Sequence, residues 1–241
     1  MQLLRILLYI LASFIIFIFL FIMLLFISSL FINTKKYYDK NSKYYRFLLN
    51  SSTFLMMLLL RIHVHTTGLE KVPQDTRFVL VGNHLSKFDP ILQWFVLRKY
   101  DIAFISKIEN FNVPIFGRFI RKCCFRAIDR ENPGKAMDTI RDATKLIKND
   151  EVSIGVYPEG TRGTGDGLLP FHNGVFYIAK NAKCPIVVMN TKNTRNISKN
   201  YPFHKTDVYF DVVDVMSVDD VKANNTKKIG ERVRHALEKC V

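Results

Sequence analysis

The sequence predicts an α/β protein with a mixed, mainly parallel sheet flanked by helices and preceded by an N-terminal membrane helix. After Gly68, short apolar runs typical of buried strands alternate with segments whose apolar residues recur every three or four positions, as in amphipathic helices. Before that point the chain opens with an almost unbroken apolar run. Strands that alternate with helices favour a mainly parallel sheet with helices on both faces.

The opening run extends from Leu3 to Ile32, and Arg5 is its only charged residue. About 20 apolar residues span the hydrocarbon core of a bilayer, so this run is long enough even when tilted. A secretory signal peptide has a shorter apolar core followed by a cleavage site of small residues, and neither is evident. Residues 1–33 are therefore predicted to form a transmembrane or membrane-inserted helix, with a cleaved signal peptide as the alternative.

Basic residues follow this helix, whereas only Arg5 and the amino terminus precede its core. The residues concerned are Lys35, Lys36, Lys40, Lys43 and Arg46. This positive-inside bias predicts a single N-terminal anchor with the rest of the chain on the cytoplasmic side. The four cysteines include no C-x-x-C pair, which agrees with reduced cytosolic thiols and indicates neither zinc nor a redox switch.

Residues 34–62 are predicted to form a basic linker and a second apolar helix, before a domain at residues 63–241. The apolar stretch 47–62 is too short to span a bilayer comfortably. A helix on the membrane surface and a buried core helix both fit it. About 180 residues then remain, which is a size at which one domain buries a core of its own.

The formal charge is +14, which favours an anionic partner. The basic residues are dispersed, and no RNA- or DNA-binding signature accompanies them. Beside a membrane helix, an anionic phospholipid surface is the nearer partner. The sequence therefore favours lipid over nucleic acid.

The elements of the domain follow in order from these patterns. Apolar runs bounded by turn residues predict strands at 78–82, 102–106, 125–128, 152–157, 186–189 and 208–215. Helical periodicity and start signals predict helices at 90–99, 134–148, 175–182 and 218–240. For the first helix, Asp89 is expected as the N-cap and Pro90 as the first helical residue.

Two polar segments follow predicted strands, and the first contains His84 and Asp89. The four residues between them can fold back, so that the carboxylate meets the imidazole. A histidine can accept the proton of an attacking alcohol at neutral pH, and a carboxylate on its other ring nitrogen fixes the tautomer. On spacing alone, however, a capping Asp89 and a loop His84 are the simpler interpretation.

The second segment is Val156-Tyr157-Pro158-Glu159-Gly160-Thr161-Arg162-Gly163. Glycines on both sides of Thr161 and Arg162 let the backbone approach a ligand closely. An arginine can bind a phosphate through two parallel hydrogen bonds, and Glu159 could hold that arginine or accept a hydrogen bond from a substrate hydroxyl. Alone, the segment could equally be a surface turn, and it is not a Walker motif.

Together, in this order and about 75 residues apart, the two segments resemble the glycerolipid acyltransferase family. That family includes the 1-acyl-glycerol-3-phosphate acyltransferases and carries an N-H-x-x-x-x-D motif and a later P-E-G-T-R motif. The matching residues here are Asn83-His84…Asp89 and Pro158 to Arg162. The resemblance covers about residues 63–215 and extends to the N-terminal membrane element.

The resemblance implies a role for each matching residue. His84 would be the general base and Asp89 its orienting partner. The residues that would bind the phosphate-bearing acceptor are Glu159, Gly160, Thr161, Arg162, Lys107 and Arg130. Four features depart from the family pattern: Cys124 stands for a glycine, Ala127 for a bulky apolar residue and Val188 for a proline, and the stretch Phe171-His172-Asn173-Gly174 lacks the lysine common before that glycine.

The implied reaction transfers a fatty acyl group from a thioester, acyl-CoA or acyl carrier protein, to lysophosphatidate, which gives phosphatidate in phospholipid biosynthesis. No cofactor is implied, and no metal, since the six histidines lack a ligand spacing such as H-E-x-x-H. Open alternatives are another lysophospholipid or glycerol-3-phosphate as acceptor, and an acyl-enzyme on Ser86. A membrane lipid hydrolase and a catalytically inactive lipid-binding protein are further alternatives.

Overall fold

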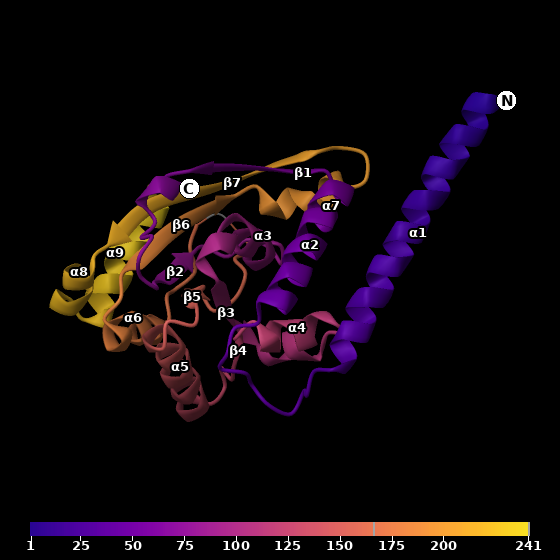
Figure 1. The fold of residues 1–241 in the computed structure, drawn as a ribbon. Helices are drawn as coiled ribbons and strands as arrows, with labels where there is room; N and C mark the ends of the chain where they lie inside the picture. The colour runs from indigo at the N-terminus through magenta and orange to yellow at the C-terminus, as the bar shows by residue number, and fades with distance from the viewer. Residues whose placement is uncertain (166, 241) are drawn as a thin grey trace.

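The strands assemble into a seven-stranded sheet in the computed structural model, which describes residues 1–165 and 167–240. Their order is β1-β7-β6-β2-β5-β3-β4 (Figure 1). All neighbours pair in parallel except β6 and β7, which are antiparallel. The strands are β1 (Ile62–Thr67), β2 (Val79–Gly82), β3 (Ile102–Lys107), β4 (Arg126–Ile128), β5 (Ser153–Val156), β6 (Ile186–Lys192) and β7 (Thr206–Met216). The predicted mixed, mainly parallel α/β fold is confirmed.

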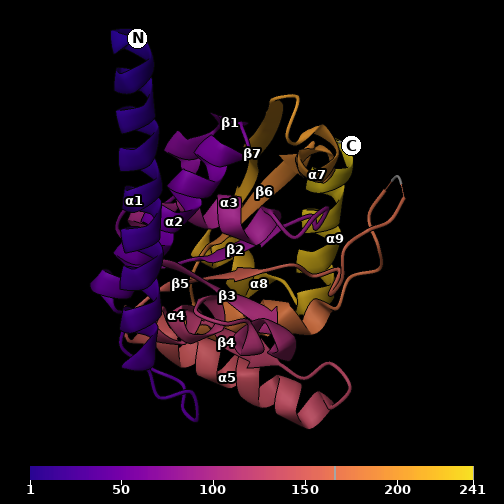
Figure 2. The same cartoon turned by 90° about the vertical axis from the view of Figure 1, so that its right-hand side faces the viewer.

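Helices cover the sheet on both faces, with α2 and α3 on one side and α9 on the other (Figure 2). The helices are α1 (Gln2–Leu30), α2 (Lys43–Leu59), α3 (Asp89–Val96), α4 (Phe116–Lys122), α5 (Pro133–Lys148), α6 (Tyr177–Ala182), α7 (Ile197–Asn200), α8 (Val218–Ala223) and α9 (Thr226–Glu238). Because both faces are covered, the central strands β2 and β5 are buried along their whole length.

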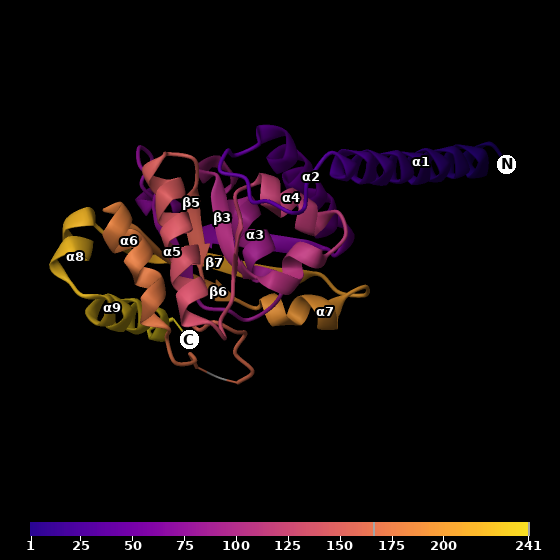
Figure 3. The same cartoon turned by 90° about the horizontal axis from the view of Figure 1, so that it is seen from below.

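The predicted N-terminal apolar helix is confirmed as α1, whose 29 residues extend beside the rest of the molecule (Figures 1 and 3). At about 1.5 Å per residue it is roughly 43 Å long, more than the thickness of a hydrocarbon core. Its most apolar 18-residue window is 0% buried by protein. In the part of the chain that the structure describes, only α1 is long and apolar enough to cross a membrane.

Helix α2 begins at Lys43, four residues earlier than predicted, and has two different faces. Tyr45, Leu48 and Leu49 on one face are buried in the core of the domain. Phe47 and Phe54 on the opposite face are 67% and 60% exposed. The helix is therefore part of the core, and it leaves a second apolar face uncovered by protein.

Two predicted helix boundaries are wrong. Asp89 is the first residue of α3 and not its N-cap; its carboxylate points back to the preceding loop and caps no N–H of the helix. The predicted helix 218–240 is two helices, because α8 ends at Ala223 and α9 begins at Thr226 with Asn225 as its N-cap. The Asn225 side chain accepts a hydrogen bond from the backbone N–H of Lys228 at 2.9 Å, which caps the second helix.

Candidate active site

The two polar segments meet because they follow neighbouring parallel strands. Val81 of β2 pairs with Val156 of β5 in parallel register, so the loops after both strands leave the same edge of the sheet. That edge, at the carboxyl ends of parallel strands, is where α/β proteins bind ligands. The sheet thus brings residues 75 positions apart in the chain into one site.

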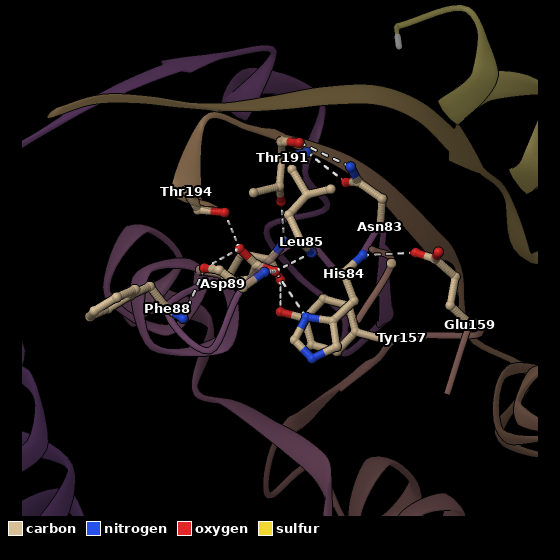
Figure 4. A network of polar contacts seen from close by, with 12 residues as sticks. Asn83, His84, Leu85, Phe88, Asp89, Tyr157, Glu159, Thr191 and Thr194 are labelled. Carbon is tan, nitrogen blue, oxygen red and sulfur yellow. Dashed lines mark hydrogen bonds and ion pairs between the residues drawn. The ribbon is translucent and has the colours of Figure 1, made fainter. Parts of the chain in front are cut away.

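Asp89 is the buried centre of a hydrogen-bond network, with no exposed surface (Figure 4). Its Oδ2 accepts hydrogen bonds from the backbone N–H of Leu85 at 2.6 Å and of Ser86 at 2.7 Å, and lies 2.9 Å from Nδ1 of His84. Its Oδ1 accepts from the hydroxyls of Ser86, at 3.2 Å, and Thr194. Only donors surround this carboxylate, which fixes its orientation toward the imidazole.

This arrangement determines the tautomer of His84. Because Asp89 acts as an acceptor, Nδ1 of His84 carries the hydrogen and donates it, so that Nε2 presents a lone pair. The imidazole side chain is 17% exposed and lines a cavity. A histidine held this way can take a proton from a hydroxyl group bound in that cavity.

Tyr157 supports the imidazole from behind. Its ring stacks on that of His84, with centroids 4.2 Å apart and planes 14° apart. The Tyr157 hydroxyl donates to Oε1 of Gln93 at 2.9 Å, and Nε2 of Gln93 donates to the Thr191 hydroxyl at 2.9 Å. Burial raises the pKa of Tyr157 well above its ordinary value, with a further contribution from the charge of Asp89, so the phenol stays protonated.

Glu159 connects the two loops through its carboxylate. Its Oε1 accepts the backbone N–H of His84 at 2.8 Å, and its Oε2 accepts that of Leu169 at 2.9 Å. The side chain is only 4% exposed. The backbone N–H of Gly163 donates in return to the carbonyl of His84 at 2.9 Å. In this structure Glu159 holds the loops together, while its direct contact with an acceptor stays a prediction.

A cavity of about 890 Å³ contains most of the predicted binding residues. Besides His84 it is lined by Lys107, Arg130, Gly160, Thr161 and Arg162. The three cationic side chains are exposed, and within residues 1–165 and 167–240 none of them forms an ion pair with a carboxylate. Gly160 has φ +71°, and a side chain there would lie 2.9 Å from the ring of His172. The polar lining of the cavity is therefore positive, and His84 belongs to the same lining.

The rest of the lining is mainly apolar. Its walls come from several elements and include Leu49 of α2, Trp94 of α3, Phe104 of β3, and Phe116 and Ile120 of α4. A cavity lined by both cationic and apolar side chains matches an amphiphile with a charged head group and a hydrocarbon chain. The helix α2, for which a membrane-surface helix and a core helix were both open from the sequence, contributes Leu49 to the lining of this cavity.

Ser86 is not placed as a nucleophile. Its hydroxyl donates to Asp89 and accepts the backbone N–H of Phe88 at 3.1 Å, and the residue is buried. The alternative of an acyl-enzyme on Ser86 therefore lacks an available hydroxyl. Among residues 1–165 and 167–240, no group of three or more His, Cys, Asp and Glu side chains is placed to hold a metal ion.

Thr194 and Arg195 follow β6 and complete the site from a third loop. Neither residue was among those predicted from the sequence. Thr194 is fully buried and donates to Asp89. Nη2 of Arg195 donates to the carbonyl of Gly163 at 2.7 Å, and Nη1 to that of Gly165 at 3.2 Å, which holds the second polar segment. No local sequence signal marks these two residues, because only the pairing of β6 with β2 brings their loop to the site.

Known proteins are similar to this chain in sequence and in fold. The acyltransferase family model matches residues 63–192. A 1-acyl-sn-glycerol-3-phosphate acyltransferase of Haemophilus influenzae is 28% identical over 175 residues, which cover 71% of this chain and 72% of that protein. The protein of the same name from Bacillus subtilis is 33% identical over 143 residues, 59% of this chain and 68% of that protein.

A solved structure has the same fold. The crystal structure of the 1-acyl-sn-glycerophosphate (LPA) acyltransferase PlsC from Thermotoga maritima matches this chain with a TM-score of 0.65 and 23% sequence identity. The match covers 81% of this chain and 79% of that one.

Proposed function

The chain belongs to the acyltransferase family, and from this we propose that it transfers a fatty acyl group from an acyl thioester to the free hydroxyl of 1-acyl-glycerol-3-phosphate, giving phosphatidate. The observation that carries the proposal is the His84–Asp89 pair, whose imidazole lines a cavity that also has cationic and apolar side chains in its lining. An acceptor with a phosphate, a hydroxyl and an acyl chain matches those three features.

In the proposed reaction Nε2 of His84 takes the proton of the acceptor hydroxyl as its oxygen attacks the thioester carbonyl carbon. The new C–O bond forms, a tetrahedral oxyanion results, and its collapse breaks the C–S bond. The imidazolium returns its proton to the departing thiolate. Asp89 stabilises the imidazolium through its 2.9 Å contact with Nδ1, as the carboxylate does in a serine-hydrolase triad. Atoms and charges balance without a covalent acyl-enzyme.

The acceptor phosphate is proposed to bind at the cationic part of the cavity lining. Arg162 can offer two parallel N–H donors, and Lys107 and Arg130 add positive charge. Gly160 and Thr161 let the backbone come close to the phosphate. The apolar part of the lining can hold an acyl chain, of which each buried CH₂ group contributes about 0.8 kcal/mol.

The membrane supplies the acceptor and keeps the product. We propose that α1 anchors the protein with residues 63–241 on the cytoplasmic side, where the basic residues after α1 lie near anionic lipids. Each Lys or Arg close to such a surface contributes about 1 kcal/mol to membrane binding. A cytoplasmic site is accessible to acyl-CoA and to acyl carrier protein, both of which are candidate donors.

Product analysis tests this proposal. The full-length protein in phosphatidylcholine vesicles receives labelled acyl-CoA or acyl carrier protein, and in parallel lysophosphatidate, glycerol-3-phosphate, another lysophospholipid or no acceptor. Phosphatidate formed fastest from lysophosphatidate supports the assignment. Faster acylation of one of the other acceptors would show that this acceptor, and not lysophosphatidate, is the preferred substrate. Release of free fatty acid at the same rate with and without an acceptor would indicate a hydrolase.

A further inference from the structure

A second cavity is lined by the last turns of α1, by the segment before α4 and by α4 itself. Figure 1 shows that α1 and α4 lie side by side where α1 reaches the domain. Its volume is about 480 Å³. Its lining combines apolar side chains with two arginines. Among the lining residues are Phe26, Leu30, Val113, Ile115, Arg118 and Arg121. Of these, Val113 also lines the cavity beside His84, so the two cavities are neighbours.

The two arginines lack an anionic partner. In residues 1–165 and 167–240, no carboxylate lies within ion-pair distance of Arg118 or Arg121. Arg118 donates one hydrogen bond, from Nη1 to the carbonyl of Ser29 at 3.0 Å. Nε of Arg121 is buried and has no acceptor, although burying an unpaired charged donor is costly. Two guanidinium groups in one cavity therefore have unused donors.

Aromatic rings hold one of these guanidinium groups in place. The guanidinium carbon of Arg121 lies 5.0 Å from the ring centroid of Phe111 and 5.5 Å from that of Tyr37. Such cation–π contacts limit the movement of the side chain without neutralising its charge. A guanidinium group fixed in this way is prepared to bind a phosphate through parallel hydrogen bonds.

The position of the cavity along α1 identifies the class of anion. Phe26 and Leu30 lie in the last turns of α1 and are 49% and 56% exposed, so this part of the helix faces lipid when α1 is in a membrane. Lys35 and Lys36 follow at once, which is typical of the depth of lipid head groups. Apolar side chains beside two arginines at that depth fit the acyl chains and the phosphate of one lipid molecule.

We propose that this cavity binds the phosphate of an anionic membrane phospholipid through Arg118 and Arg121, with the lipid chains along Phe26 and Leu30. The site is separate from the cationic lining of the acyl-transfer cavity, to which Arg162 belongs. The bound lipid fastens the end of α1 to α4 and so holds the domain against the bilayer. This inference depends on α1 lying in a membrane and does not depend on which lipid is acylated.

Lipid binding to the purified full-length protein tests the proposal, without any acyl donor, so that the result is independent of acyl transfer. Native mass spectrometry in detergent measures the apparent Kd for dioleoyl phosphatidylglycerol, dioleoyl phosphatidylcholine and inorganic phosphate. The variant R118Q/R121Q removes the two guanidinium groups. The control K227Q/K228Q removes two exposed charges from α9, on the far side of the sheet (Figure 2).

We expect the wild type and the control to prefer phosphatidylglycerol to phosphatidylcholine, and R118Q/R121Q to bind phosphatidylglycerol at least about tenfold more weakly. One lost hydrogen bond between charged groups accounts for about 1.5–3 kcal/mol, and 1.4 kcal/mol is tenfold in Kd. Equal affinity of R118Q/R121Q and of the control for phosphatidylglycerol would overturn the proposal. Displacement of phosphatidylglycerol by an equimolar amount of inorganic phosphate would overturn the lipid assignment.

A second measurement covers the case in which R118Q/R121Q does not fold. Wild-type protein in vesicles is photolabelled with phosphatidylglycerol that carries a diazirine on an acyl chain near the glycerol. We expect labelling of the peptides that contain Phe26, Leu30 and residues 113–121. Excess unlabelled phosphatidylglycerol should reduce this labelling, whereas phosphatidylcholine should not. Labelling that spreads evenly along α1 and is reduced equally by both lipids would contradict a site.

Discussion

Replacing Asp89 by asparagine tests the electrostatic role of the buried carboxylate. Asparagine has nearly the same shape, and its amide oxygen can take the place of Oδ2. There it would still accept the N–H groups of Leu85 and Ser86 and the hydrogen on Nδ1 of His84. Its NH₂ group would then face the hydroxyls of Ser86 and Thr194, which can turn and accept. The fold and the histidine tautomer should therefore survive.

What the variant loses is the negative charge beside the imidazolium that forms during the reaction. At an effective dielectric constant of about 20, unit charges about 4 Å apart attract each other by about 4 kcal/mol. Each 1.36 kcal/mol of transition-state stabilisation changes the rate tenfold, so Asp89→Asn should lower kcat about a thousandfold. The Nδ1 to Oδ2 distance of 2.9 Å places the two charges within this range.

Initial rates of phosphatidate formation in vesicles measure the effect, and thermal unfolding shows whether the variant is folded. Thr194→Val is the matched control, because it removes one donor from Oδ1 and keeps the charge and all three contacts of Oδ2. We expect it to lower kcat much less than Asp89→Asn does, because the negative charge stays beside the imidazolium. A folded Asp89→Asn enzyme within tenfold of wild type would refute the electrostatic role of the carboxylate.

Three further predictions follow from the geometry. Arg162→Ala should raise the KM for lysophosphatidate about tenfold or more, with a smaller change in kcat. The control Arg141→Ala, on the exposed face of α5, should change neither KM nor kcat. An unchanged KM for Arg162→Ala would remove Arg162 from the phosphate site. Burial raises the pKa of the thiols of Cys123 and Cys184 to about 12 and that of Cys124 to about 11. A maleimide at pH 7.5 should therefore label only Cys240 in the native protein and all four thiols after unfolding, and rapid native labelling of more than one would contradict this burial. The hydrogen bond from Lys40 lowers the pKa of Glu151. The contribution of Glu151 to stability is therefore present above the pKa of the unfolded state and is lost as pH falls through the pKa of the folded state. Glu151→Gln should lower Tm at pH 7 more than at pH 3, and an equal change at both would exclude this linkage.

The central strands could be predicted from sequence because their residues reflect burial on both faces. Val79 to Gly82 and Ser153 to Val156 are short apolar runs that only a covered sheet accommodates. In contrast, β1 has the sequence Ile62-His63-Val64-His65-Thr66-Thr67 and is largely exposed at the edge of the sheet, so no apolar run indicated it. Its partner β7 is identifiable by its length, but their pairing depends on contacts distant in sequence.

The candidate site could be predicted in part for a similar reason. The loops after β2 and β5 carry dense polar motifs, so His84 and Asp89 stood out from their surroundings. Thr194 is a common residue in a polar segment, and only the pairing of β6 with β2 brings it to Asp89. The position of Glu159 between two backbone N–H groups likewise depends on loop geometry that no local pattern reveals.

The most direct test of the central claim is the rate of acyl transfer by His84→Gln in vesicles with labelled acyl thioester and lysophosphatidate. Glutamine keeps a polar side chain against Tyr157 and Asp89 but cannot accept a proton at neutral pH. General-base catalysis contributes about 10²–10⁴-fold. If His84 is the base, a folded variant should form phosphatidate at least about a hundredfold more slowly than wild type. A folded His84→Gln variant that forms phosphatidate at the wild-type rate would show that another group removes the proton.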